Sequence, residues 1–263
     1  MITNFLFVCY MIFMSCSLPV SIGLQTAYKS HKLAWADSVI YVATRQMHLV
    51  CIEEQCMPVD QSYGAGTSFV IDKVDGKSIL MTAAHLCYPY NAGQQSPLSE
   101  LGILETRFDL SIVLGESLLI VQEILVLDVE NDICVFSVPV DIGREMPISR
   151  KDPRYGDNVW TIGAPAGYFP ESAKPITRGT FSGEAERRME NGSLNPFFNF
   201  TMPAVGGMSG SPIINEHGEV VGIVSAVNSD WHLISFSPTL DQIKDSIDLA
   251  MEKLNSDVPE NED

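Results

Sequence analysis

Gly206-Gly207-Met208-Ser209-Gly210-Ser211-Pro212 is the stretch of this 263-residue chain from which the fold can be predicted. Two other stretches precede it. Thr82-Ala83-Ala84-His85 ends one apolar run, and Asn131-Asp132-Ile133 begins another. A hydroxyl that acts as a nucleophile needs a base within reach, and the base needs a group that orients it. The order histidine, aspartate, serine therefore predicts one site with an activated serine.

In that site Ser209 is the predicted nucleophile, His85 its base, and Asp132 the carboxylate that orients the base. Asp128 is the nearest competitor for the acid role. Glycines beside the serine let the backbone turn, so the amides of Gly207 and Ser209 can form an oxyanion hole. Taken singly, each residue also fits a turn or a buried core position. Their combination favours catalysis.

These motifs resemble those of the chymotrypsin-fold (trypsin-like) serine proteases, closest in style to the HtrA/Deg and glutamyl-endopeptidase branches. Further matching segments occur in the family's order, and the resemblance covers roughly residues 38 to 240. These segments are 64–71, 79–85, 161–165, 176–179 and 221–225. The resemblance implies a serine endopeptidase that hydrolyses polypeptides through an acyl-enzyme and requires no cofactor.

The pattern of short apolar runs agrees with an all-β fold. Between residues 38 and 238, β-branched runs alternate with Gly, Pro, Asn and Asp, without a convincing 3.6-residue period. With the resemblance, this predicts two six-stranded antiparallel β-barrels followed by a C-terminal helix. Expected strands are 39–44, 47–52, 67–71, 78–82, 111–114, 118–127 and 133–138, then 158–162, 176–183, 197–202, 211–215, 220–227 and 232–235.

The expected domain order follows from these strands. Residues 24–145 form the N-terminal barrel, which carries His85 and Asp132, and residues 146–238 form the C-terminal barrel, which carries Ser209. The stretch 139–157 is the expected linker. Apolar residues share one face of 240–254, which predicts a helix packed on the second barrel, within a C-terminal segment 239–263 that ends in an acidic tail. No PDZ domain is expected after it.

Composition supports a soluble surface and limits the partners. Apolar residues make up 46 % of the chain, enough for a full core, and the formal net charge is −17 at pH 7. A chain this acidic is a poor partner for nucleic acid, whose phosphates require cationic contacts. No CxxC or histidine-rich spacing suggests a metal site. The oligomeric state is left open.

The first 23 residues carry no charged side chain, and 5–14 are almost wholly apolar. We expect residues 1–23 to be a secretory signal peptide cleaved after Gly23, which predicts a secreted or extracytoplasmic protein. The second alternative is a membrane anchor over residues 5–24. A lipoprotein signal ending at Cys16 ranks third, because phenylalanine is unsuitable at the first position of its motif.

Four cysteines follow the leader. Cys51 and Cys56 flank a short turn that an exported chain could bridge with a disulfide. Cys87 and Cys134 each lie two residues after a predicted site residue, so the fold brings them near one another. For this second pair, a disulfide and two buried free thiols remain alternatives.

Departures from the trypsin pattern indicate a different mode of activation and a different substrate preference. Met208 replaces the aspartate that pairs with a newly cut N-terminus in trypsins, so zymogen activation of that kind is not expected. Pro203 replaces the acidic residue that selects Arg or Lys. With Ala204 and Val227 nearby on the resemblance, the primary pocket is expected to be apolar. The predicted preference is a small or aliphatic residue on the acyl side of the cut bond.

Ser225, Ala226 and Val227 are expected to bind the substrate backbone as an added strand. Glutamyl specificity, through His232 and Thr201, is one alternative. However, the pocket histidine of glutamyl endopeptidases stands immediately before the residue matched by Ser225, and here that residue is valine. A surface histidine is therefore the favoured interpretation of His232. The other alternative is a non-catalytic homologue that binds peptides or a partner protein through the same cleft.

Overall fold

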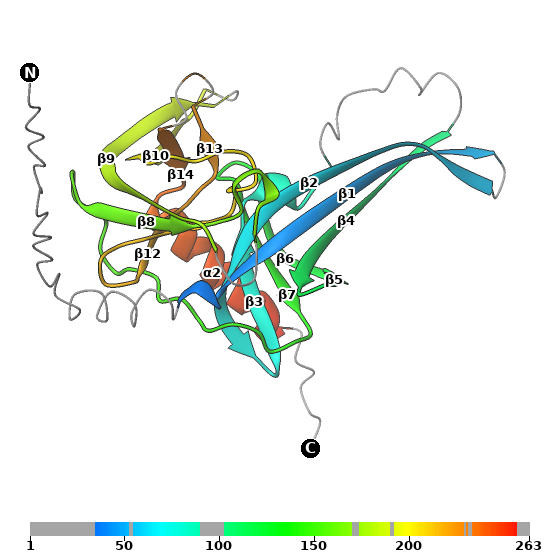
Figure 1. The fold of residues 1–263 in the computed structure, drawn as a ribbon, viewed down its shortest axis with the longest axis horizontal. Helices are drawn as coiled ribbons and strands as arrows, with labels where there is room; N and C mark the ends of the chain where they lie inside the picture. Colours follow the sequence, from blue (N-terminus) through cyan, green and yellow to red (C-terminus); the bar gives the residue numbers. More distant parts are fainter. Residues whose placement is uncertain are drawn as a thin grey trace, which may run out of the picture.

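The computed structural model describes residues 35–52, 55–89, 103–169, 174–189, 192–228, 230 and 233–256. These segments form two seven-stranded antiparallel sheets and one long C-terminal helix (Figure 1). The fold is the predicted chymotrypsin-like double barrel, although each sheet has seven strands rather than six. The predicted signal peptide lies outside the described residues. Within them, we find no helix with the length and apolar character needed to span a bilayer.

The first sheet carries the strand order β5-β4-β1-β2-β3-β7-β6. Inward-facing side chains such as Val42, Leu80, Ile112 and Phe136 are buried and form one of its core clusters. Its strands are β1 (Val39–Ile52), β2 (Gln55–Val74), β3 (Lys77–Thr82), β4 (Ile103–Leu114), β5 (Ser117–Ile120), β6 (Glu123–Asp128) and β7 (Ile133–Val138).

The strands of this sheet differ from the prediction: β2 begins at Gln55 rather than at residue 67, and β4 begins at Ile103 rather than at residue 111. The predicted strands 39–44 and 47–52 form one continuous strand, β1, which pairs with β2 along its whole length. The predicted strand 118–127 instead breaks into two. The amide of Val121 donates to the carbonyl of Leu110 on β4 (2.8 Å), whereas β6 pairs with β7. The chain therefore passes from pairing with β4 to pairing with β7, and this break gives the sheet seven strands instead of the predicted six.

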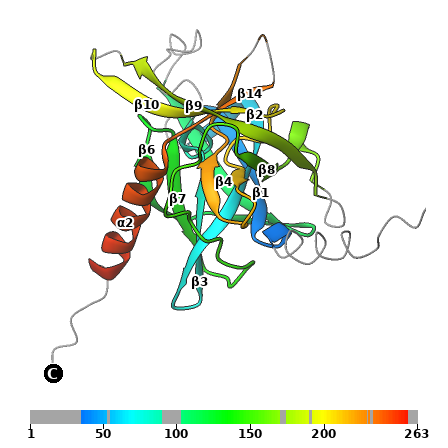
Figure 2. The same cartoon turned by 90° about the vertical axis from the view of Figure 1, so that its left-hand side faces the viewer.

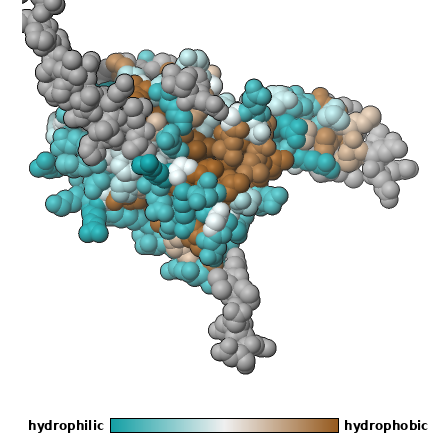
Figure 3. All heavy atoms as spheres, turned by 60° about the horizontal axis from the view of Figure 1, so that its bottom comes forward, coloured by the Kyte–Doolittle hydropathy of each residue, from teal (hydrophilic) through white to brown (hydrophobic). Residues whose placement is uncertain are grey.

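Strands β1, β2 and β4 extend beyond the barrel as a long arm (Figure 1). A disulfide between Cys51 and Cys56, which face each other in the hairpin register, lies near its tip. A hydrophobic surface appears where the arm joins the body (Figure 3). The edge strand β5 also carries two apolar side chains, Leu118 and Ile120, that are more than half exposed.

The second sheet has the order β12-β11-β8-β9-β10-β14-β13. Phe181, Phe198 and Phe200 meet edge-to-face in its core. The predicted strand 220–227 splits because its first part, β12, pairs with β11, whereas from Ser225 onward the chain bonds to β14. The strands of the second sheet are β8 (Asn158–Ile162), β9 (Ile176–Arg188), β10 (Leu194–Thr201), β11 (Pro212–Ile214), β12 (Val220–Ile223), β13 (Ala226–Val227) and β14 (Ile234–Ser237).

The C-terminal helix α2 (Leu240–Ser256) begins with a capping box, in which Thr239 and Gln242 bond each other's backbone amides. The sequence predicts packing on the second barrel, but that description is incomplete. Figure 2 shows α2 running beside β6 and β7 of the first sheet. Ile243 shares a buried cluster with Ile133, and Lys253 donates to the carbonyl of Ile124 (3.1 Å). The helix therefore links the two barrels.

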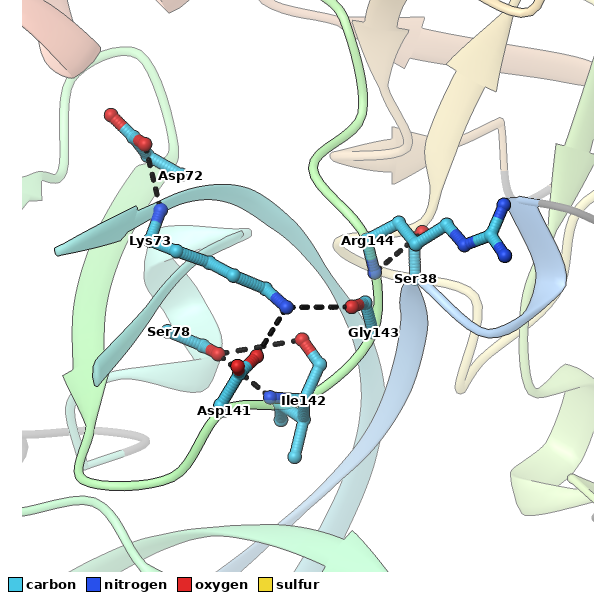
Figure 4. Close-up of polar contacts among 8 residues, drawn as sticks. All are labelled: Ser38, Asp72, Lys73, Ser78, Asp141, Ile142, Gly143 and Arg144. Carbon is cyan, nitrogen blue, oxygen red and sulfur yellow. Dashed lines mark hydrogen bonds and ion pairs between the residues drawn. The ribbon is translucent and has the colours of Figure 1, made fainter. Parts of the chain in front are cut away.

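The connection between the barrels, residues 139–157, is held against the first sheet by polar contacts (Figure 4). The ammonium of Lys73 donates to the Asp141 carboxylate and to the carbonyl of Gly143 (2.9 Å for the latter). The amide of Arg144 donates to the hydroxyl of Ser38 (3.2 Å). Further on, Ser149 donates to Val220 of the second sheet (2.9 Å). The linker thus contacts both barrels.

Candidate active site

His85 lies in a short 3-10 helix, η1 (Ala84–Leu86), directly after β3. Its neighbours Ala84 and Leu86 are buried in the first barrel, whereas the side chain of His85 is 39 % exposed. The two apolar anchors on either side fix the turn. The imidazole is thereby presented at the surface of a rigid element, where a base can reach a substrate.

Asp132 contacts His85 through both carboxylate oxygens. Nδ1 of His85 is 3.0 Å from each oxygen, and the backbone amide of His85 donates to Oδ1 (2.9 Å). Asp132 has a φ of +58°, in the left-handed region that non-glycine residues rarely adopt. Such strained residues persist where the surroundings over-determine them, often at functional sites. The structure therefore joins the predicted base and acid directly.

A second-barrel residue completes the surroundings of this carboxylate. The hydroxyl of Ser225 donates to Oδ2 of Asp132 (2.5 Å). That Ser225 binds substrate backbone stays a prediction; its own amide donates to the carbonyl of Phe236 (3.0 Å). Asp128, the competitor for the acid role, accepts bonds from the amide and side chain of Asn131. The described contacts thus assign Asp132, not Asp128, to His85.

Ser209 lies in the loop between β10 and β11. Its carbonyl accepts a bond from the amide of Thr67 (2.8 Å), in β2 of the first barrel. Gly210 donates to Val224 (2.7 Å), directly before Ser225, and a Cβ at Gly210 would lie 2.1 Å from the Thr82 hydroxyl. The serine loop is therefore packed against the end of β3, next to the element that carries His85.

Thr67 is a residue that sequence reasoning missed. It is fully buried, and besides its contact to Ser209 its hydroxyl donates to the carbonyl of Gly207 (3.1 Å) and accepts from the amide of Ala164 (3.2 Å). The only local signal was its place in the segment 64–71 that resembles the family. A buried hydroxyl needs partners. Here its partners are Gly207 in the serine loop and Ala164 after β8, both in the second barrel.

The predicted oxyanion loop is held in one orientation. Ala166, itself at a φ of +52°, donates to the carbonyl of Gly206 (2.7 Å). Because the peptide unit is planar and trans, this contact also sets the direction of the Gly207 amide. Among the described residues, neither the Gly207 nor the Ser209 amide donates to another backbone group. Both remain available to an oxyanion.

Only glycine fits at position 207. Its φ is +90°, and a Cβ there would lie 2.2 Å from the carbonyl oxygen of Ala164. Met208, the departure from the trypsin pattern, is buried in the second-barrel core with Met202 and Ala204. The loop is thus anchored by apolar packing where trypsins use an ion pair.

A disulfide between Cys87 and Cys134 joins the segments that carry His85 and Asp132. The prediction left a disulfide and free thiols open, and the structure has the disulfide. A crosslink across 47 residues contributes roughly 4 kcal/mol of stability in the chain-entropy description. It restrains the two site segments covalently.

The predicted specificity residues lie in two places. Pro203 is exposed at the start of the serine loop, and Ala204 is buried in the core. Ala226 and Val227 form β13, which is the last strand of its sheet. An edge strand offers unpaired backbone groups to an added strand. The arrangement is suited to peptide binding.

The described contacts do not test the glutamyl alternative, because His232 lies outside the described residues. Thr201 shares a hydrogen bond with Ser182 (2.7 Å) on the neighbouring strand, and Val224 is buried. In the part of the chain that the structure describes, no group of three or more His, Cys, Asp or Glu could hold a metal ion.

Solved structures of several proteases share this fold. A protease named Rv3671c from M. tuberculosis, in its active form, has a TM-score of 0.60 at 17 % identity, covering 86 % of each chain. An HtrA-type protease with a tripeptide has a TM-score of 0.59 at 17 % identity, covering 86 % of this chain and 64 % of the other. A serine endoprotease from Yersinia pestis has a TM-score of 0.56 at 15 % identity, covering 86 % and 66 %.

Sequence comparison adds the family. No curated protein matches the chain significantly. The family profile described as "Trypsin-like peptidase domain" matches residues 66–223, more than half of the chain and including His85, Asp132 and Ser209. The chain therefore belongs to the trypsin-like peptidase domain family.

Proposed function

We propose that this trypsin-like peptidase is a serine endopeptidase in which His85, Asp132 and Ser209 form the catalytic triad. The observation that carries the proposal is the contact between His85 and Asp132. Nδ1 of the imidazole lies 3.0 Å from both carboxylate oxygens, and the carboxylate is also held by the backbone of His85 and by Ser225. The neighbouring loop carries Ser209.

The triad chemistry follows from these contacts. An ionised carboxylate only accepts hydrogen bonds, so Asp132 keeps the imidazole proton of His85 on Nδ1 and leaves the lone pair on Nε2 free. In the proposal, Nε2 accepts the Ser209 proton as Oγ attacks the peptide carbonyl. The same proton then passes to the leaving amine, and the acyl-enzyme forms. Water, deprotonated by Nε2, hydrolyses the acyl group and regenerates Ser209.

The amides of Gly207 and Ser209 form the proposed oxyanion hole. The bond from Ala166 to Gly206 supports a loop that is already oriented before substrate binds. Donors that need no rearrangement during the reaction are the most effective stabilisers of developing charge. This loop therefore needs no newly cut N-terminus to set it, in agreement with Met208 in place of the trypsin aspartate.

Ser209 labelling tests the proposed function. A fluorophosphonate should modify Ser209 in the wild-type protein, and the adduct can be located by mass spectrometry. His85→Ala should label far more slowly, because the hydroxyl loses its base. Equal labelling of both proteins, or a correctly folded wild type that is not labelled, would support the non-catalytic homologue and contradict the proposal.

For specificity, we propose a small or aliphatic residue on the acyl side of the cut bond. Pro203 stands where an acidic residue selects Arg or Lys in trypsins, and Ala204 and Val227 add no charge nearby. Ala226 and Val227 would pair with the substrate backbone.

A peptide library tests this preference. Cleavage after Ala, Val or Leu should exceed cleavage after Glu, Lys or Arg by at least about 10-fold, because an uncharged pocket cannot compensate a buried charge. Sequencing the cleavage products gives the preference directly. Cleavage chiefly after Glu would favour the glutamyl alternative instead.

An oxidising, extracytoplasmic location is part of the proposal. Two disulfides are typical of exported proteins, and the uncharged, apolar leader predicts export.

A further inference from the structure

The turn that carries Asp132 is hydrogen-bonded to side chains from the other barrel. The carbonyl of Glu130 accepts hydrogen bonds from the guanidinium of Arg187 and from the side-chain amide of Asn195 (3.3 Å for the latter). The same amide donates to Oδ1 of Asn131 (3.0 Å). The two residues immediately before Asp132 are thus both bonded to the second barrel.

The two residues that donate these hydrogen bonds, Arg187 and Asn195, are cross-strand neighbours in one hairpin. Arg187 on β9 lies directly opposite Asn195 on β10 in the strand register, so their side chains leave the same face of the sheet. Asn195 is 7 % exposed, and a buried amide of this kind needs its hydrogen bonds. Its oxygen accepts a bond from Nε2 of Gln242 (2.8 Å). Gln242 is the same residue that caps α2.

The turn also borders a pocket and contains a residue with a strained backbone. A pocket of about 240 Å³ opens beside these contacts, lined by Asn131, Arg187, Asn195, Ser225 and Gln242 among others. A residue at a φ of +58° costs about 1 to 3 kcal/mol and persists only when its surroundings hold it.

We propose that Asn195, with Arg187, is a positioning residue for the catalytic acid. Through Glu130 and Asn131 it holds the β6–β7 turn in the conformation that aims the Asp132 carboxylate at His85. The inference rests on the proposed function in that Asp132 is the acid of the triad. It means that the second barrel, which supplies the nucleophile, also positions the acid that the first barrel carries.

Asn195→Asp is the sharpest test. The substituted carboxylate keeps the size of the amide and still accepts from Gln242, but it cannot donate to Glu130 or Asn131. We expect kcat for peptide hydrolysis to fall by about 10- to 100-fold with little change in KM, since a displaced acid affects the reaction rather than ground-state binding.

A spectroscopic readout separates positioning from general destabilisation. The proton shared by Nδ1 of His85 and Asp132 should give a far-downfield proton NMR signal in the wild type. In Asn195→Asp this signal should broaden or move upfield. Arg188→Ala is the matched control, because Arg188 follows Arg187 directly but, among the described residues, its side chain bonds only to the nearby carbonyl of Gly192 (3.4 Å). It should leave the signal and kcat unchanged.

Each outcome decides the inference. If Asn195→Asp keeps both the wild-type kcat and the wild-type downfield signal, the positioning role is wrong. If that variant does not fold, Arg187→Ala, which truncates an exposed side chain, is measured by the same two readouts and decides in the same way. A wild type that shows the downfield signal but no Ser209 labelling overturns the proposed function, while the effect of the variant on the signal still tests the positioning role.

Discussion

Replacing Ser209 with alanine should lower kcat for peptide hydrolysis by about 10⁶-fold, because the acyl-enzyme route needs the Oγ nucleophile. The loop should survive, since its contacts to Thr67 use the backbone carbonyls of Ser209 and Gly207 rather than the hydroxyl. A residual rate of about 10³- to 10⁴-fold over water should remain from the oxyanion hole and substrate binding. Steady-state hydrolysis of the best library peptide measures the loss.

Ser211→Ala is the control. It removes a hydroxyl two residues away in the same loop, whose side-chain oxygen is buried and has no hydrogen-bond partner among the described residues. Removing an unsatisfied buried hydroxyl should cost little. We expect kcat close to wild type for this variant. Equal losses in the two variants would show that the loop, rather than the Ser209 nucleophile, is what the substitutions damage.

Asp132→Asn should lower kcat by about 10⁴-fold, the second largest effect. The backbone amide of His85 donates to Oδ1, so the asparagine oxygen must occupy that position. The new NH₂ group then takes the place of Oδ2 and donates toward Nδ1 of His85. Nδ1 becomes the acceptor, the imidazole proton moves to Nε2, and Nε2 can no longer take the Ser209 proton.

Asp128→Asn is the matched comparison for this experiment. Asp128 accepts bonds from Asn131 and has no described contact to His85. Its substitution should reduce kcat far less than Asp132→Asn does. Circular dichroism and thermal unfolding of both variants check that each is folded. If Asp128→Asn were the more damaging change, the assignment of the acid would be wrong.

The proposed catalytic residues could be predicted from sequence because their signals are local. His85 follows an apolar strand and two alanines, and Asp132 precedes another apolar strand. Ser209 has glycines at positions 206, 207 and 210 around it. Gly207 has a φ of +90° and no room for a Cβ, so the loop requires glycine there, and that requirement is visible in the sequence. The number of strands per barrel was less predictable, because β5 and β6 part only where Val121 bonds across to β4.

The supporting residues could not be found in this way. Arg187 and Asn195 carry no local motif. Thr67 and Ser225 lie in segments that resemble the family, but all four bond to segments far away in the chain or in the other barrel, which the sequence does not show. The helix α2 shows the same limit. Its apolar face could be predicted from the sequence, but its contact with β6 and β7 could not.

Local sequence was sufficient to predict the family, the double-barrel architecture and the candidates for nucleophile and base, because backbone conformation and strand pattern depend on near neighbours. Only the tertiary structure decided that Asp132 rather than Asp128 faces His85, that Cys87 and Cys134 are bridged, and that the second barrel holds the acid turn. These features depend on distances between segments separated by dozens of residues. Chain folding, not residue type, sets such distances.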